Sequence, residues 1–260
     1  MTGSSQPADR GSTSRRGSLN SLHALLACLV FLMGVSGCTL IDSFLTNTSQ
    51  MTAEELIMEA NAAMQNKEYV RASKYYKKVK ENYPFSDYTE LAEIGLADAS
   101  FFAGEYSQAE AAYKEFESLH PGHKHINYIL LQIGVSNLKQ FQSIDLPQDN
   151  ITEALEYFQR VRDLFPESPY ADKAGHYIRQ CHRYQAEHEI FVADFYQRRE
   201  KFLSAWKRYQ FVLDEYSEFK DIQEYAAQQA RAAYFKYQQS RSEQEHTQRY
   251  GSWKQWFDWL

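Results

Sequence analysis

The stretch ASKYYKKVKENYP, residues 72–84, places an aromatic residue four positions and a proline twelve positions after an alanine. Three later stretches repeat this spacing, although the last has serine in place of the proline. The four sets are Ala72, Tyr76, Val79 and Pro84; Ala109, Tyr113, Phe116 and Pro121; Ala154, Phe158, Val161 and Pro166; and Ala205, Tyr209, Val212 and Ser217. Self-similarity of this kind indicates a repeat protein.

The spacing is typical of the second helix of a tetratricopeptide-type repeat, in which helix pairs stack on one another. The alanine lets two helices approach closely, the aromatic ring fills the gap between neighbouring pairs, and the proline stops the helix. The sequence therefore predicts an all-α fold, a superhelical stack of about five helix-turn-helix repeats. Such an array is expected to bind other chains rather than to catalyse a reaction.

Capping residues set the expected helix boundaries in the first half of the chain. The first helix is expected to run from an N-cap at Thr52 to about Gln65. The polar stretch 140–150 is expected to form a loop, and Asn150 is expected to cap the helix that follows.

Two long helices are expected in the second half. One is capped by Ser168, has Pro169 at its first position and is expected to run to about Arg199. The other, a closing helix over residues 220–240, is expected to cover the open end of the stack.

The first forty residues form a targeting segment. A basic start precedes an apolar run over residues 22–33, which is too short to span a membrane comfortably. The residues that follow, Val35, Ser36, Gly37 and Cys38, resemble the lipobox of bacterial lipoproteins. By that resemblance the leader is cut before Cys38 and the Cys38 thiol carries lipid. An ordinary signal peptide with an incidental cysteine is the alternative.

These features divide the chain into four segments. Residues 1–37 are expected to be the signal peptide, 38–51 the lipidated cysteine and its tether, 52–240 the repeat array and 241–260 a tryptophan-rich tail. The residue after Cys38 is Thr39 and not an aspartate. In lipoprotein sorting, the absence of aspartate at this position favours the outer membrane.

Composition excludes some partners. The chain has a net charge of −6 and its leader carries +2, so the remainder carries about −8. An acidic surface argues against nucleic acid, whose phosphates require patches of lysine and arginine. Outside Cys28 in the leader and Cys38, only Cys181 remains, so no intramolecular disulfide can form. Cys181 is expected to be a small buried residue.

No catalytic signature is present. The sequence lacks a phosphate-binding glycine loop, a nucleophile elbow and a His-Glu-x-x-His pattern, so we predict neither an enzyme nor a cofactor. His120, His123 and His125 crowd one loop, but no acidic residue is spaced to complete a metal site with them. We therefore predict no metal, and a metal-dependent hydrolase built on this loop is the rival from another class of protein.

The order of the linker motifs resembles the BamD family, the outer-membrane lipoproteins of the β-barrel assembly machinery. These motifs are the lipobox, YPFSDY at 83–88, HPGHKHINY at 120–128 before Gly134, and FPESPYA at 165–171. The resemblance covers about residues 50–240. It implies five repeats, an outer-membrane location facing the periplasm, and binding to the barrel protein BamA and to unfolded outer-membrane β-barrel proteins. In some bacteria it also implies smaller lipoproteins of the machinery as partners.

The resemblance also implies site residues. Tyr83 matches a family tyrosine implicated in substrate contact, and with Phe85 and Tyr88 it is expected to bind substrate peptides. Arg208 matches an arginine of the fourth repeat that is tied to BamA. A wall of aromatic rings suits an extended segment that ends in an aromatic residue, and a nearby cation suits its carboxylate.

A second binding function is the alternative: the chain would be a generic repeat lipoprotein of the envelope that organises peptidoglycan enzymes or polymer secretion.

Three features depart from the BamD pattern: a shorter loop before Asn150, Ser217 in place of proline, and the C-terminal tail. One helical face of that tail carries Trp253, Trp256, Phe257 and Leu260. This face suits a membrane interface, a partner or packing on the closing helix.

Overall fold

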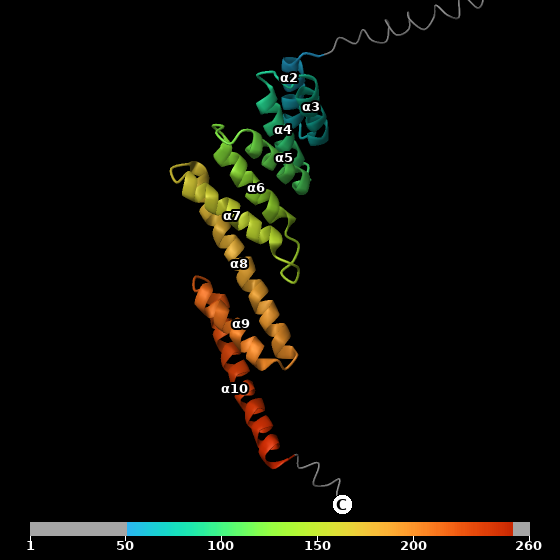
Figure 1. The fold of residues 1–260 in the computed structure, drawn as a ribbon. Coiled ribbons are helices and arrows are strands. Elements are labelled where there is room, and N and C mark those ends of the chain that lie inside the picture. Colours follow the sequence, from blue (N-terminus) through green and yellow to red (C-terminus); the bar gives the residue numbers. More distant parts are fainter. Residues whose placement is uncertain (1–50, 252–260) are drawn as a thin grey trace, which may run out of the picture. The chain divides into compact units, whose positions relative to one another are not determined.

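The structure, a computed structural model, describes residues 51–251, which form nine α-helices and no strand (Figure 1). The all-α prediction is confirmed. The helices are α2 (Ala53–Gln65), α3 (Tyr69–Asn82), α4 (Thr89–Phe102), α5 (Tyr106–Leu119), α6 (Ile126–Gln140), α7 (Asp149–Leu164), α8 (Pro169–Arg198), α9 (Phe202–Glu215) and α10 (Lys220–Tyr250). Each packs mainly on the helices before and after it in the chain, as in a repeat array.

The repeat motif lies on the second helix of each pair, as the spacing predicts. Its alanines Ala72, Ala109, Ala154 and Ala205 have no exposed surface. Its aromatic rings are also buried, with Tyr76 only 3% exposed. Helices α2 to α9 thus form four pairs, and α10 packs on the last of them.

The turns inside three pairs share one backbone conformation. Lys67, Gly104 and Glu200 have φ of 61°, 83° and 58°, which is the left-handed region. The residue after each donates its backbone N–H to a carbonyl five positions earlier, for example from Glu105 to Ser100 at 3.0 Å. This is the Schellman closure of a helix, and it turns the chain directly into the next helix.

Two expected boundaries are wrong. Asn150 does not cap α7, because the helix already begins at Asp149 and the Gln148 carbonyl accepts from the Thr152 N–H. The closing helix does not end near 240 but continues to Tyr250.

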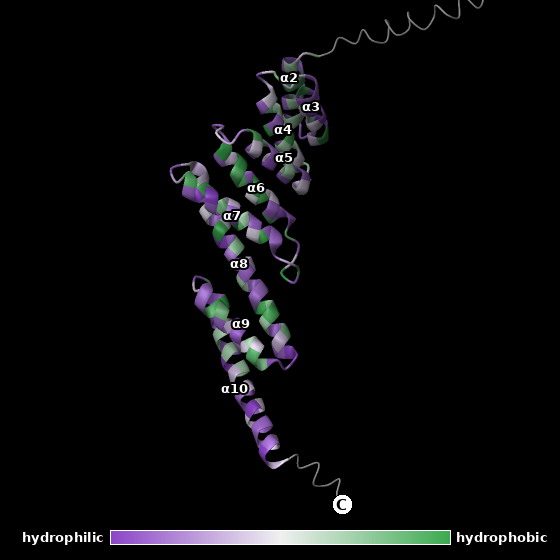
Figure 2. Ribbon diagram, viewed as in Figure 1, coloured by the Kyte–Doolittle hydropathy of each residue, from purple (hydrophilic) through white to green (hydrophobic). Residues whose placement is uncertain are grey.

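The extension of α10 has a local cause. Its last turns are hydrophilic (Figure 2) and are supported by i,i+4 contacts such as Arg241 to Glu245 at 2.9 Å. The first residue that stops the helix is Gly251, with φ of 74°. Tyr234 and Lys236 still contact rings of α9, but every residue from Arg241 to Tyr250 is exposed, so these last turns are not packed into the core.

Other expectations agree with the structure. The Ser168 hydroxyl accepts from the Tyr170 N–H at 3.2 Å, with Pro169 in the first turn of α8. Cys181 is fully buried, and burial raises the pKa of its thiol to about 12. Within residues 51–251, no helix combines the length and the apolar character that crossing a membrane would need.

Candidate functional site

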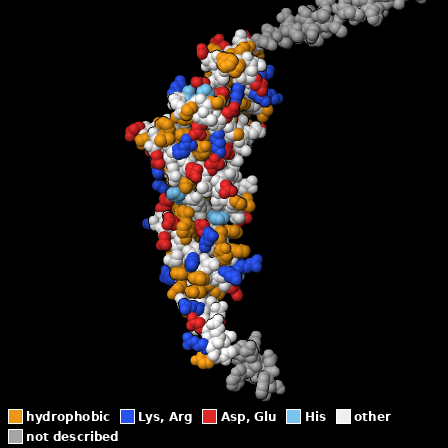
Figure 3. All heavy atoms as spheres, viewed as in Figure 1, with side chains coloured by type: hydrophobic (Ala, Val, Ile, Leu, Met, Phe, Trp, Pro, Cys, Tyr) orange, Lys and Arg blue, Asp and Glu red, His pale blue; other side chains and the backbone are white. Residues whose placement is uncertain are grey.

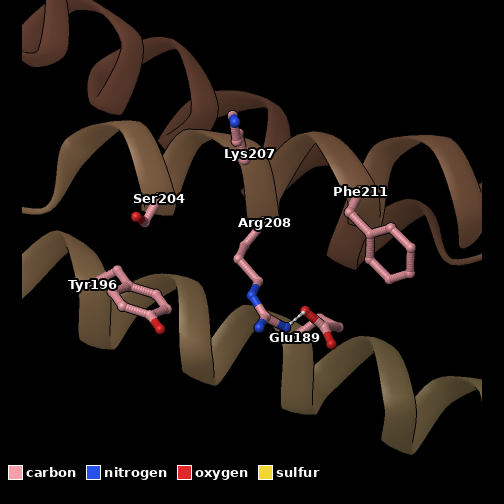
Figure 4. Close-up of a pocket in the computed structure, with 6 residues that line it drawn as sticks. All are labelled: Glu189, Tyr196, Ser204, Lys207, Arg208 and Phe211. Carbon is pink, nitrogen blue, oxygen red and sulfur yellow. Dashed lines mark hydrogen bonds and ion pairs between the residues drawn. The ribbon is translucent and has the colours of Figure 1, made fainter.

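A groove of about 440 Å³ lies between α8 and α9 (Figure 4). Its lining residues are Glu189, Tyr196, Ser204, Lys207, Arg208 and Phe211. Arg208 points from α9 across the groove and donates from Nη1 to Glu189 Oε2 on α8, at 2.6 Å. The groove therefore contains the arginine that the sequence singled out.

The ion pair between Arg208 and Glu189 orients the Arg208 side chain but adds little to the stability of the fold. The Arg208 side chain is 41% exposed and Glu189 is 17% exposed. An ion pair this open to solvent contributes at most about 1 kcal/mol. The bond uses one of the five N–H donors of a guanidinium, so the contact orients Arg208 while leaving it able to bind a partner.

The rest of the groove combines charge with aromatic surface. Lys207 is exposed, and the Phe211 ring is 45% exposed at the end of the groove (Figure 4). Burial, followed by the negative charge of Glu189, raises the pKa of Tyr216 on the neighbouring turn. Arginine and aromatic residues are the side chains most enriched at the centres of protein interfaces. The groove thus has the chemistry of a docking surface.

A partly buried carboxylate links α9, the helix that carries Arg208, to its two neighbours. Asp194 on α8 accepts from the Tyr209 hydroxyl on α9 at 2.5 Å and from the Tyr225 hydroxyl on α10 at 3.0 Å. Tyr209 directly follows Arg208 and is fully buried. Asp194 therefore holds three successive helices in register beneath the groove.

The same arrangement occurs earlier in the chain. Asp98 on α4 accepts from the Tyr113 hydroxyl on α5 at 2.5 Å and from the Tyr128 hydroxyl on α6 at 2.7 Å. In the first pair, Asn61 takes this role for Tyr76, at 2.7 Å. Burial raises the pKa of Asp98, and the two tyrosine hydrogen bonds oppose that shift.

The second predicted site lies in the linker between α3 and α4. Phe85 is completely exposed, whereas Tyr83 and Tyr88 are half-buried. The linker is held by the Tyr83 carbonyl, which accepts from the Thr89 hydroxyl at 2.8 Å. The three aromatic residues share one linker, but the Phe85 ring is fully exposed and packs on neither tyrosine. Arg208 belongs to the last helix pair and forms a separate surface.

The histidine loop has acidic neighbours that sequence spacing did not reveal. His120 lies with Nε2 2.9 Å from Glu93 Oε2 and Nδ1 3.4 Å from Glu90 Oε1, both on α4. Helix packing thus brings two carboxylates beside His120 that the spacing of the sequence does not show. Even so, no group of three or more ligating side chains in residues 51–251 is arranged to hold a metal ion.

Sequence reasoning missed Glu189, Tyr196 and Phe211 as members of the groove. The sequence indicates these residues only by placing them on α8 and α9, the two helices joined by the turn at residues 199–201. The lipobox residues Val35, Ser36, Gly37 and Cys38 and the tail residues Trp253, Trp256, Phe257 and Leu260 lie outside the described residues.

Comparisons with known proteins cover most of the chain. The family model YfiO, described as an outer membrane lipoprotein, matches residues 49–249. Outer membrane protein assembly factor BamD of Xylella fastidiosa is 26% identical over 205 residues, which is 75% of this chain and 70% of that protein. The protein of the same name from Haemophilus influenzae is 26% identical over 207 residues, or 76% and 77% of the two chains.

Among solved structures, the TPR2AB domain of yeast Sti1 in its complex with pHSP90 aligns with a TM-score of 0.45 and 16% identity. The alignment covers 71% of this chain and 70% of that chain.

Proposed function

The chain belongs to the YfiO family of outer membrane lipoproteins, and from this premise we propose that it is an adaptor for outer membrane protein assembly. In this role it binds BamA and the unfolded precursors of β-barrel proteins and promotes their folding and insertion without a covalent step. The observation that carries the proposal is the groove in which Glu189 holds Arg208 beside exposed aromatic surface.

The groove between α8 and α9 is the proposed contact with BamA. Arg208 can exchange or share its Glu189 contact with a carboxylate of the partner, since a guanidinium suits bidentate pairing. Phe211 supplies apolar area next to that charge. A pre-oriented arginine lowers the entropy cost of association.

The linker between α3 and α4 is the proposed contact with unfolded clients. Its fully exposed Phe85, flanked by Tyr83 and Tyr88, offers ring surface to an extended segment rich in aromatic residues. The two surfaces lie on different helix pairs, so a client and BamA can bind without competing for the same residues.

We further propose that the protein is anchored by lipid on Cys38 and faces the periplasm from the outer membrane. The motif Val35-Ser36-Gly37-Cys38 follows a basic and apolar leader, as lipoprotein processing requires. Several acyl chains, at about 0.8 kcal/mol for each buried methylene, hold a protein firmly on a bilayer. We also propose smaller lipoproteins of the machinery as partners.

Arg208→Ala is expected to weaken recovery of BamA at least tenfold, by roughly 1.4 kcal/mol or more of binding free energy. The helical circular dichroism is expected to stay unchanged, because the residue is partly exposed and its ion pair contributes little to stability. The measurement is quantitative co-purification from detergent-solubilised outer membranes. The matched control is Arg241→Ala, which removes another exposed arginine from an ion pair on α10. Equal recovery of BamA with both variants would count against the groove as the contact.

A further inference from the structure

Helix α3 carries a concentration of positive charge on a chain that is acidic overall. Five cations occur in its fourteen residues, and its only acidic residue is Glu81. The cations are Arg71, Lys74, Lys77, Lys78 and Lys80, and the preceding turn adds Lys67. The whole chain has a net charge of −6, so this helix stands out against the rest. Figure 3 shows Lys and Arg side chains gathered beside the α2–α3 end of the described chain.

Internal ion pairs neutralise only part of this charge. Arg71 contacts Glu59 and Glu68 at 3.2 and 2.9 Å, and Lys80 contacts Glu115 at 2.8 Å. A further set of cations is exposed and has no carboxylate partner in the part of the chain that the structure describes: Lys67, Lys74 and Lys78. Lys77 has one loose contact, 3.6 Å from Glu81, with both side chains mostly in solvent. Four lysines therefore keep charge available for an external anion.

Apolar and aromatic surface lies among these lysines. Two cations lie over the Tyr75 ring: Arg71 Cζ and Lys78 Nζ are each 5.6 Å from the ring centroid. A groove of about 610 Å³ at the start of α3 is lined by Lys67, Glu68, Tyr69, Val70, Arg71, Lys74, Phe102 and Ala103. Val70 and Phe102 in this groove are 58% and 53% exposed. Lysines with apolar stems beside tyrosine rings are typical of surfaces that lie at the boundary between lipid headgroups and acyl chains.

We propose that the face formed by Val70, Lys74, Lys77 and Lys78 of α3, together with Lys67 in the preceding turn, lies on anionic phospholipid headgroups of the leaflet that anchors the protein. This inference rests on the proposed lipid at Cys38. From Cys38 to the start of α2 at Ala53 the chain spans at most about 50 Å, so the first helix pair is the packed part nearest the anchor along the chain. Clustered lysines next to a membrane anchor bind anionic lipid electrostatically.

The test uses the full lipidated protein, purified in detergent and reconstituted into vesicles. One set of vesicles contains phosphatidylcholine alone, and the other also contains about 30% phosphatidylglycerol. A membrane-impermeant amine reagent then modifies lysines, and mass spectrometry of peptides measures each site. Labelling of Lys74, Lys77 and Lys78 is expected to fall about fivefold in the anionic vesicles and to return at about 0.5 M salt, which screens the attraction. Lys220 and Lys236, which are exposed on α10, are the internal controls and are expected to label equally in both sets.

A double variant sharpens the test. Lys74→Glu with Lys78→Glu is expected to abolish the salt-sensitive protection of Lys77, while Lys220→Glu with Lys236→Glu is expected to preserve it. Equal labelling of α3 on both kinds of vesicle would overturn the inference and leave the lipid anchor intact. Protection in native outer-membrane fragments but not in anionic vesicles would also overturn it, because the occupant would then be an acidic protein. Protein that floats with neither vesicle would overturn the anchor and this inference together, without bearing on the Arg208 groove.

Discussion

Replacing Asp98 by alanine is expected to lower the free energy of unfolding by about 2–5 kcal/mol, a large part of the total for a small domain. The Tyr113 and Tyr128 hydroxyls both donate to Asp98, and the Tyr113 side chain has no exposed surface. Without the acceptor, two donors remain in an environment that water does not reach freely, and each such donor costs about 1–3 kcal/mol. Urea denaturation followed by circular dichroism at 222 nm, the usual helical signal, measures the change.

Asp98→Asn is the matched control, because Asn61 already accepts from Tyr76 at the corresponding place in the first pair. An amide oxygen keeps both tyrosine donors satisfied, so the expected loss is below about 1 kcal/mol. If the alanine and asparagine variants lose the same stability, the hydrogen bonds of Asp98 do not hold these helices together.

The pH dependence of stability separates the two variants from the parent chain. Burial raises the pKa of Asp98 in the folded state above its unfolded value of about 3.9. As the pH rises above that value, the unfolded carboxyl ionises first, so the contribution of Asp98 to stability is greatest in acid and falls towards neutral pH. Asp98→Asn is expected to remove this component of the pH profile.

Replacing Gly95 by alanine is expected to destabilise the chain by about 1–3 kcal/mol, although alanine is the better helix former. A Cβ at this position would lie 2.5 to 2.8 Å from three ring carbons of Tyr76. The ring cannot swing aside easily, because Tyr76 is 3% exposed and its hydroxyl is bound to Asn61. Gly134 is in the same position against Phe158, with a closest approach of 2.6 Å.

Gly175→Ala provides the control for this prediction. Gly175 lies in α8 with no heavy atom within 4 Å of a Cβ placed there. The substitution is expected to stabilise the chain by up to about 1 kcal/mol through helix propensity alone. Thermal and urea unfolding of the two variants in parallel gives the difference between them. Stabilisation by both substitutions would show that the close packing of Tyr76 on α4 is unimportant.

The helices were predictable because their signals are local. Residues 72–84 alone contain the signals for one helix. The alanine at 72 marks a close contact between helices, the ring of Tyr76 fills the space between helix pairs, and Pro84 ends the helix. The structure buries Ala72 and Tyr76 as expected. The end of α10 was missed because residues 241–250 are polar without a helix breaker, and only Gly251 stops the helix.

The contacts that build the candidate sites depend on how neighbouring helices pack. Arg208 was singled out by resemblance, but its partner Glu189 lies nineteen residues earlier on α8, and no local pattern joins them. His120 meets Glu93 from 27 residues earlier for the same reason. Asp98 binds Tyr128 thirty residues later, which requires the stacking of two helix pairs to be known.

We propose that this chain is an assembly adaptor that binds BamA through the Arg208 groove. The most direct measurement is affinity purification of the full chain from cross-linked cells of its own host, followed by quantitative mass spectrometry of everything recovered. We expect BamA and unfolded β-barrel precursors to be enriched with the parent chain, and BamA to be lost with Arg208→Ala but not with Arg241→Ala. Recovery of peptidoglycan enzymes or polymer-secretion proteins without BamA would refute this role.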